Sequence, residues 1–121
     1  MEGRSTVVLG ASPKPERYSN MAVQRLVAHG HPVVAVGARE GRIAEEPVRT
    51  ELPEGLRCHT VTIYLNEHAQ QAWQDRVLAL APQRIIFNPG AENPALARAA
   101  TERGIEVVEG CTLVMLAAGT Y

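Results

Sequence analysis

The stretch TVVLGASPKPERYSNMAVQRLVAHGHPVVAV, residues 6–36, decides the fold class. Its opening TVVL is β-branched and apolar and ends at Gly10, a pattern that predicts a buried strand. Residues 19–30 then repeat apolar side chains at helical spacing, and residues 31–38 form a second apolar run. A strand, a helix and a strand in this order predict a parallel βαβ unit.

The same alternation continues to the end of the chain. Further strands are predicted over residues 58–66, 84–90 and 105–110, and further helices over residues 67–81, 93–104 and 111–119. Five strands alternating with helices predict a Rossmann-like, doubly wound parallel five-stranded sheet, an α/β fold in a three-layer α/β/α sandwich. We expect the strand order 3-2-1-4-5. Residues 39–57 carry no clear pattern, and a short helix or a short strand fits them equally.

Residues suited to helix caps support these assignments. Ser19 or Asn20 is expected to cap the first helix, Asn66 the second and Asn93 the third, because their side-chain oxygens can accept from free backbone amides. The third helix also has a proline at its first position and a glycine just beyond its end. Gly30 is expected to end the first helix.

Bulk composition limits the possible functions. The 121 residues are 45% hydrophobic and 21% charged, which predicts one soluble domain spanning residues 1–121. The formal net charge of −1 argues against nucleic acid or an anionic membrane as the partner. The N-terminal MEGRST has no apolar segment, and no apolar run approaches the roughly 18 residues of a spanning helix.

Only two cysteines, Cys58 and Cys111, occur, and they lie far apart in the sequence. Neither a metal-ligand spacing nor a disulfide framework is visible, so we expect free thiols and no bound metal. These features together predict a cytoplasmic protein.

The loop GASPKPERYSN, residues 10–20, is the first candidate site. Ligands of doubly wound sheets bind at the carboxyl edge where the winding reverses, expected here between the first and fourth strands. Gly10 permits a sharp turn, Ala11 and Ser12 combine small side chains with amide donors, and the following helix N-terminus favours an anion. Lys14 and Arg17 add full charges. The alternative is an ordinary connecting loop with both cations solvated.

The loop matches neither of two common nucleotide motifs. Ser12 and Pro15 stand where the later glycines of GxGxxG would lie, and no GxxxxGK[ST] occurs. The acidic residue expected after the second strand is also missing. Arg39 stands there instead, with Glu40 one position later, and an arginine suits a phosphorylated ribose.

Two segments together carry a family resemblance. VVLGASPKPERYSNMAVQRLVAHGHPVVAV and IIFNPGAENPALARAATERGIEVVEGCTLVML resemble the small single-domain CoA-binding proteins. These proteins are similar to the N-terminal CoA-binding domain of the succinyl-CoA synthetase alpha subunit. The likeness runs from Thr6 to about Leu116 and implies a Rossmann-like fold that binds coenzyme A. None of the four histidines lies in a motif that would transfer the synthetase's phosphoryl chemistry.

The resemblance also implies positions for the ligand. The phosphates would meet Gly10, Ala11, Ser12, Pro13, Lys14, Arg17, Tyr18 and Ser19. The adenosine would lie by the end of the second strand, at Val36, Gly37, Ala38 and Arg39, with Arg39 near the 3′-phosphate. The adenine or the pantetheine arm would be bordered by residues 64–66 and 88–90, which include Tyr64, Asn88 and Gly90.

Two further side chains have competing interpretations. Cys111 precedes a helix, where backbone amides favour a thiolate that faces the CoA thiol; a small buried cysteine is the favoured alternative. Trp73 marks either a dimer contact or core packing, with equal weight. We therefore expect a monomer or a homodimer.

The sequence thus predicts a CoA- or acyl-CoA-binding protein without catalysis of its own, because no paired acid and base are apparent. The alternatives are an NAD(P)-binding Rossmann enzyme and a protein-interaction module whose nucleotide site has decayed.

Overall fold

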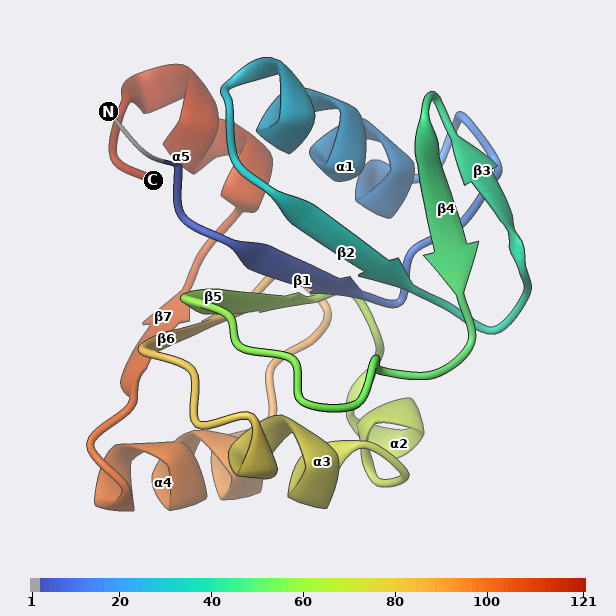
Figure 1. Ribbon diagram of the computed structural model, residues 1–121. Coiled ribbons are helices and arrows are strands. Elements are labelled where there is room, and N and C mark those ends of the chain that lie inside the picture. The colour runs from blue at the N-terminus through green and yellow to red at the C-terminus, as the bar shows by residue number, and fades with distance from the viewer. Residues whose placement is uncertain (1–2) are drawn as a thin grey trace.

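The computed structural model describes residues 3–121 as a mostly parallel, Rossmann-like sheet between two layers of helices (Figure 1). Its strands are β1 (Thr6–Leu9), β2 (Val33–Val36), β3 (Gly41–Ile43), β4 (Glu46–Arg49), β5 (Thr60–Ile63), β6 (Arg84–Phe87) and β7 (Glu106–Glu109). Its helices are α1 (Tyr18–Ala28), α2 (Glu67–Gln70), α3 (Gln74–Ala79), α4 (Pro94–Glu102) and α5 (Thr112–Ala118). The α/β class predicted from the sequence is confirmed.

The predicted strand number and order are wrong. The order within these residues is β3-β4-β2-β1-β5-β6-β7, seven strands instead of five. β5 pairs with β1 in parallel, from Thr6 opposite Thr60 to Leu9 opposite Ile63, whereas the predicted order placed it beside β2. The reason is that β4, from the unassigned segment 39–57, pairs in parallel with β2 and occupies its outer edge. β3 then pairs antiparallel with β4 and closes that side of the sheet.

Helices cover the two faces of the sheet unequally. α1 and α5 pack together on one face, and α2, α3 and α4 lie on the other (Figure 1). Successive residues of β1 point to opposite faces, so Val7 belongs to the core beneath α3 and α4 while Val8 packs with Val23 of α1. Double burial of this kind explains the continuous apolar runs of the central strands.

Local end signals are confirmed for two of the three predicted caps. The Asn66 side chain accepts a hydrogen bond from the Ala69 amide at 2.8 Å, and Asn93 accepts from the Leu96 amide at 3.1 Å. The predicted helix over 67–81 is broken into α2 and α3, and α3 begins after Trp73. The Trp73 side chain packs against the core at this break.

The predicted cap of α1 is wrong. Arg17 is its N-cap residue and makes no capping hydrogen bond with its side chain. Ser19 and Asn20 lie inside the first turn and are buried, and the side-chain Nδ2 of Asn20 donates to the Ser12 carbonyl at 2.9 Å. Asn20 therefore ties the loop that precedes α1 to the helix instead of capping it. Gly30 follows the helix end with φ +84°, as predicted.

Candidate functional site

A cavity of about 760 Å³ opens at the carboxyl edge of the central strands. Its lining comes from the loop after β1, the loop after β2, the end of β5 and the loop after β6. The lining residues are Gly10, Ala11, Ser12, Pro13, Lys14, Arg17, Tyr18, Ser19, Ala38, Arg39, Glu40, Tyr64, Leu65 and Pro89. We call this cavity the crevice.

The crevice lies where the winding reverses. The sequence predicted this reversal between the first strand and the fourth, but the third predicted strand, β5, is the one that lies beside β1. β2 lies on one side of β1 and β5 on the other, so the reversal falls between β1 and β5. The segment Tyr64–Leu65 consequently faces the first loop directly, and Pro89 represents the loop 88–93 in the lining.

Gly10 permits the close packing that shapes the crevice. Its φ of +93° lies in the region that favours glycine, and an added Cβ would approach the Leu65 side chain to 3.1 Å. The Gly10 and Ala11 amides both donate to the Val36 carbonyl, at 2.8 and 2.9 Å. The expectation that the Ala11 amide is free for an anion is therefore wrong, because β2 already accepts its hydrogen.

Amides at the start of α1 also remain for a ligand. Tyr18 and Ser19 are its first residues, and amides at these positions have no partner within a helix. Both residues line the crevice. The N-terminal end of the helix dipole adds partial positive charge at the same place.

Three cations surround the crevice opening. Lys14, Arg17 and Arg39 line it from two loops, and all three are exposed. Across residues 3–121 the structure has one ion pair, between Arg76 and Glu51 at 2.9 Å, so these cations have no carboxylate partner in the part of the chain described. The arrangement can hold a multiply charged anion such as a diphosphate.

The end of β2 contributes to the crevice indirectly. Val36 is buried and does not line the cavity. Gly37 is also outside the lining, and a Cβ there would overlap the Ala11 carbonyl oxygen, so this position needs glycine. The Gly37 amide donates to the Arg49 carbonyl at 2.8 Å. These two residues hold the first loop in place, and the residues that follow them reach the cavity.

Tyr64 places a buried hydroxyl near the crevice. The residue lines the cavity, and within residues 3–121 its hydroxyl has no hydrogen-bond partner. Burial raises the pKa of Tyr64. The phenol is therefore neutral at physiological pH.

Asn88, Gly90 and Cys111 lie outside the lining. Asn88 is buried. Its side-chain Nδ2 donates to the Thr62 hydroxyl at 2.7 Å, and its side-chain Oδ1 accepts from the Thr112 backbone amide at 2.9 Å. The side chain thus joins β5, β6 and α5. The Gly90 amide donates to the Glu92 carboxylate at 3.0 Å.

The thiols and Trp73 also lie away from the crevice lining. Cys111 is the half-buried N-cap residue of α5, and both it and Cys58 are free thiols. Trp73 is half-buried, and the Arg76 guanidinium stacks over it, with its central carbon 3.9 Å from the centroid of the Trp73 ring. Both contacts of Trp73, with the core and with Arg76, lie within one copy of the chain.

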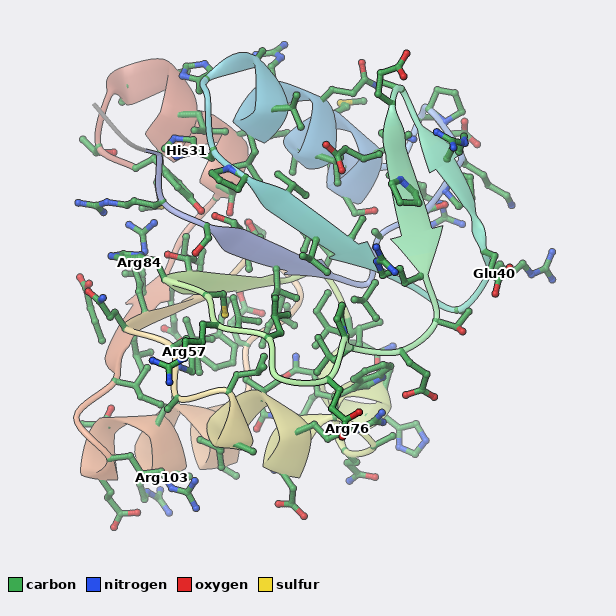
Figure 2. The ribbon with its side chains drawn as sticks, viewed as in Figure 1. His31, Glu40, Arg57, Arg76, Arg84 and Arg103 are labelled. Carbon is green, nitrogen blue, oxygen red and sulfur yellow. The ribbon has the colours of Figure 1, made fainter. Side chains whose placement is uncertain are left out.

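Sequence reasoning missed one lining residue, Glu40. In the sequence this carboxylate stands one position too late for the expected ribose contact, and its place beside Arg39 was the available signal. Figure 2 shows Glu40 at one end of the molecule and His31 and Arg84 at the opposite end. Within residues 3–121, no three His, Cys, Asp or Glu side chains gather closely enough to hold a metal ion. None of the helices in this range has the length and apolar character needed to cross a membrane.

Rossmann-like α/β folds typically bind their ligands in a crevice at the switch point of the sheet. The chain belongs to the CoA-binding domain family, whose model matches residues 4–117. Comparison with curated proteins gives no match.

Solved structures share the fold across nearly the whole chain. An uncharacterized protein is 42% identical, with a TM-score of 0.95 and complete coverage of both chains. A hypothetical protein from Pyrococcus horikoshii OT3 is 19% identical with a TM-score of 0.83, over 93% of this chain and 80% of that one. A Thermus thermophilus structure called cell-free ID.343 is 22% identical with a TM-score of 0.81, over 98% of this chain and 91% of that one.

Proposed function

We propose that the chain binds coenzyme A or an acyl-CoA in the crevice and catalyses no reaction of its own. The observation that carries the proposal is the group of unpaired cations Lys14, Arg17 and Arg39 around the start of α1. Membership of the CoA-binding domain family supports this ligand over NAD(P). The protein then acts as a carrier, a sensor or a subunit, as one cytoplasmic domain over residues 1–121, either monomeric or dimeric.

The parts of the ligand are assigned by the chemistry of the lining. The diphosphate lies against the Tyr18 and Ser19 amides and the Lys14 and Arg17 side chains. Arg39, on the neighbouring loop, meets the 3′-phosphate. The pantetheine arm leaves past Tyr64 and Pro89, where the lining is less charged. Asn88 and Cys111 then support the site without direct contact.

Isothermal titration calorimetry with CoA, NADP and NAD tests the proposal. CoA is expected to bind with a measurable affinity and both dinucleotides to bind much more weakly. Replacing Lys14 and Arg17 together with alanine should weaken CoA binding by a few kcal/mol, since charge-assisted hydrogen bonds contribute about 1.5–3 kcal/mol each. Native mass spectrometry of the purified protein provides a second test, through an adduct near the mass of CoA.

A matched control removes two arginines from elsewhere on the surface. Arg98 and Arg103 are exposed on and just after α4, on the face opposite α1. Replacing both with alanine changes the net charge by the same amount and should leave CoA affinity within about twofold. Equal losses in the two double variants would indicate a general charge effect and remove the first loop from the site.

A further inference from the structure

Four basic side chains lie at the amino edge of the sheet, the edge opposite the crevice. Arg84 is the first residue of β6, His59 directly precedes β5, and Arg4 and His31 lie two residues before β1 and β2, respectively. Figure 2 shows His31 and Arg84 at this end of the molecule. We call these four residues the basic cluster. The proposed function assigns it no part of the ligand.

The two arginines carry the charge of the basic cluster. Burial first, and then nearby positive charges that include Arg4 and Arg84, lower the pKa of both His31 and His59. Both imidazoles are therefore mainly neutral at pH 7. The backbone of Arg4 is held in place, because its amide donates to His31 Nδ1 at 2.9 Å and its carbonyl accepts from the Thr6 hydroxyl at 2.9 Å.

Arg84 is buried with one nitrogen unpaired. Its side chain is only 3% exposed, its Nε donates to the Thr60 hydroxyl, and the Tyr121 ring covers its guanidinium. Within residues 3–121 its Nη2 has no hydrogen-bond partner. Buried polar groups nearly always have a partner, so this nitrogen indicates a missing acceptor.

The Arg4 and Arg84 guanidinium groups converge on one oxygen. The Tyr121 carbonyl oxygen accepts from Arg4 Nη1 at 2.8 Å and from Arg84 Nη1 at 3.3 Å. A carbonyl oxygen is neutral and does not offset two positive charges this close together. Among residues 3–121 the single ion pair is formed by Arg76 and Glu51, so neither guanidinium has a carboxylate partner there. A buried charge without a counter-ion is strongly destabilising.

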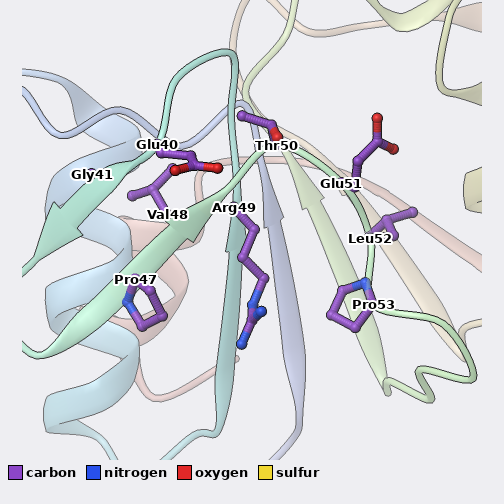
Figure 3. A pocket seen from close by; sticks show the side chains of 9 residues that line it. All are labelled: Glu40, Gly41, Pro47, Val48, Arg49, Thr50, Glu51, Leu52 and Pro53. Atoms are coloured by element: carbon purple, nitrogen blue, oxygen red, sulfur yellow. The ribbon is translucent and has the colours of Figure 1, made fainter.

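Arg49 provides a contrast with Arg84. It lines a cavity of about 490 Å³ beside β4, which the carboxylates Glu40 and Glu51 also line (Figure 3). Arg49 is exposed, so water can solvate its charge. The deficit of negative charge is therefore a property of the amino edge and not of this cavity.

A carboxylate supplies what the amino edge lacks. The Nη1 and Nη2 groups of a guanidinium form a planar fork that matches the two oxygens of a carboxylate. At Arg84 one arm of the fork bonds an oxygen and the other is unpaired. We infer that Arg4 and Arg84 form a carboxylate-binding site, in which one carboxylate oxygen lies near the present position of the Tyr121 carbonyl oxygen and the other accepts from Arg84 Nη2. This inference does not depend on the proposed function, because the site lies at the opposite edge of the sheet.

The carboxylate can come from solution, or from residue 121 when the protein is produced with Tyr121 as its last residue. Two forms of the protein separate these sources. One ends at Tyr121 with a free α-carboxylate, and the other carries an appended Gly-Ser-Gly that converts this group to an amide. Both forms carry Glu2→Gln, so that no side-chain carboxylate outside residues 3–121 contributes.

Thermal denaturation is the readout, with sodium acetate as the probe in place of sodium chloride at constant ionic strength. If the carboxylate comes from solution, acetate should raise the Tm of both forms by about 3–5 °C. If residue 121 supplies it, the form that ends at Tyr121 should melt about 3–5 °C above the extended form. Acetate should then raise the Tm of the extended form alone.

The Arg4→Ala variant locates the site. Arg4 is exposed, so the loss of its side chain should leave the fold intact, and this variant should abolish both the acetate response and the difference between the two forms. The control is Arg98→Ala, which removes an exposed arginine of α4 on the face opposite α1 and should retain both effects. Acetate should also shift the imidazole NMR signals of His31, which acetate bound in the crevice would not do.

Each outcome bears on the site. Loss of the acetate response in Arg4→Ala but not in Arg98→Ala, with shifted His31 signals, would support it for either source. Equal Tm values for the two forms, with no acetate response in either, would overturn it. An acetate response that persists in Arg4→Ala would place the anion elsewhere and would also overturn it.

Discussion

The guanidinium of Arg84 lies over the ring of Tyr121, 4.3 Å from its centroid, at the end of the sheet away from the crevice. Arg84 is only 3% exposed, and its Nε donates to the Thr60 hydroxyl at 3.0 Å. The Tyr121 ring also packs against His31, with centroids 4.8 Å apart, and the Tyr121 hydroxyl shares a hydrogen bond with Thr6. Tyr121 thus connects α5 to β1 and β6.

Replacing Tyr121 with alanine should destabilise the fold. The variant loses the cation–π contact with Arg84, the ring contact with His31 and the hydrogen bond to Thr6, for a combined cost of about 2–4 kcal/mol. Urea denaturation measures the change. The control is Tyr18→Ala, because Tyr18 is 70% exposed and its loss should change the free energy of unfolding by less than about 0.5 kcal/mol. Equal stability of the two variants would contradict the anchoring role of Tyr121.

The protein should lose stability in mild acid through His31. Burial lowers the pKa of His31, as do the nearby positive charges of His29, Arg4 and Arg84. The Arg4 amide also donates to His31 Nδ1 at 2.9 Å, a bond that requires this nitrogen to be unprotonated. Below the ordinary value of 6.5 the unfolded chain takes up a proton that the folded chain resists, so stability falls as pH falls from 6.5 toward the lowered pKa.

Thermal denaturation at pH 7.5 and pH 5.5 measures this dependence. The wild-type protein should show a larger drop in Tm between the two values than a His31→Asn variant, which cannot titrate but retains an acceptor. A drop of the same size in both proteins would assign the acid sensitivity to other groups, among which His59 also has a pKa lowered by burial.

Replacing Asn88 should lower the stability of the fold more than it lowers the affinity for the ligand. An alanine there removes its bonds to the Thr62 hydroxyl, the Ile63 carbonyl and the Thr112 amide, all in the buried interior. The expected cost is about 2–4 kcal/mol, because unpaired buried groups remain. Asn66→Ala removes one exposed capping bond and should cost only about 1 kcal/mol. A fully stable Asn88→Ala protein with weakened CoA binding would instead indicate a direct ligand contact.

Arg39 should distinguish CoA from dephospho-CoA. If its side chain meets the 3′-phosphate, the wild-type protein binds CoA more tightly by about 1.5–3 kcal/mol, the strength of a charge-assisted bond. The Arg39→Ala variant should bind both ligands with similar affinity. Competition titrations give this ratio for each protein. A wild-type protein that binds the two ligands equally would reject the assignment.

Local signals in the sequence predicted much of the molecule. Strands and helices alternate as expected because apolar periodicity and end signals act over a few residues. Asn66 and Asn93 cap their helices for this reason, since a cap bonds within three residues of itself. The loop over residues 10–20 lies at the crevice because a turn after the first strand of a doubly wound sheet ends at its carboxyl edge.

Only the tertiary structure decided which strands are neighbours and which polar groups remain for a ligand. β1 offers equivalent hydrogen-bonding edges to β2 and β5, and nothing within either strand selects the partner. The strands β3 and β4 are short and partly exposed, so they lack the apolar pattern that marks the others. The Ala11 amide bonds to the Val36 carbonyl across 25 residues, and Glu40 lines the same crevice as the first loop. Such relationships depend on the register of distant segments, which local periodicity does not encode.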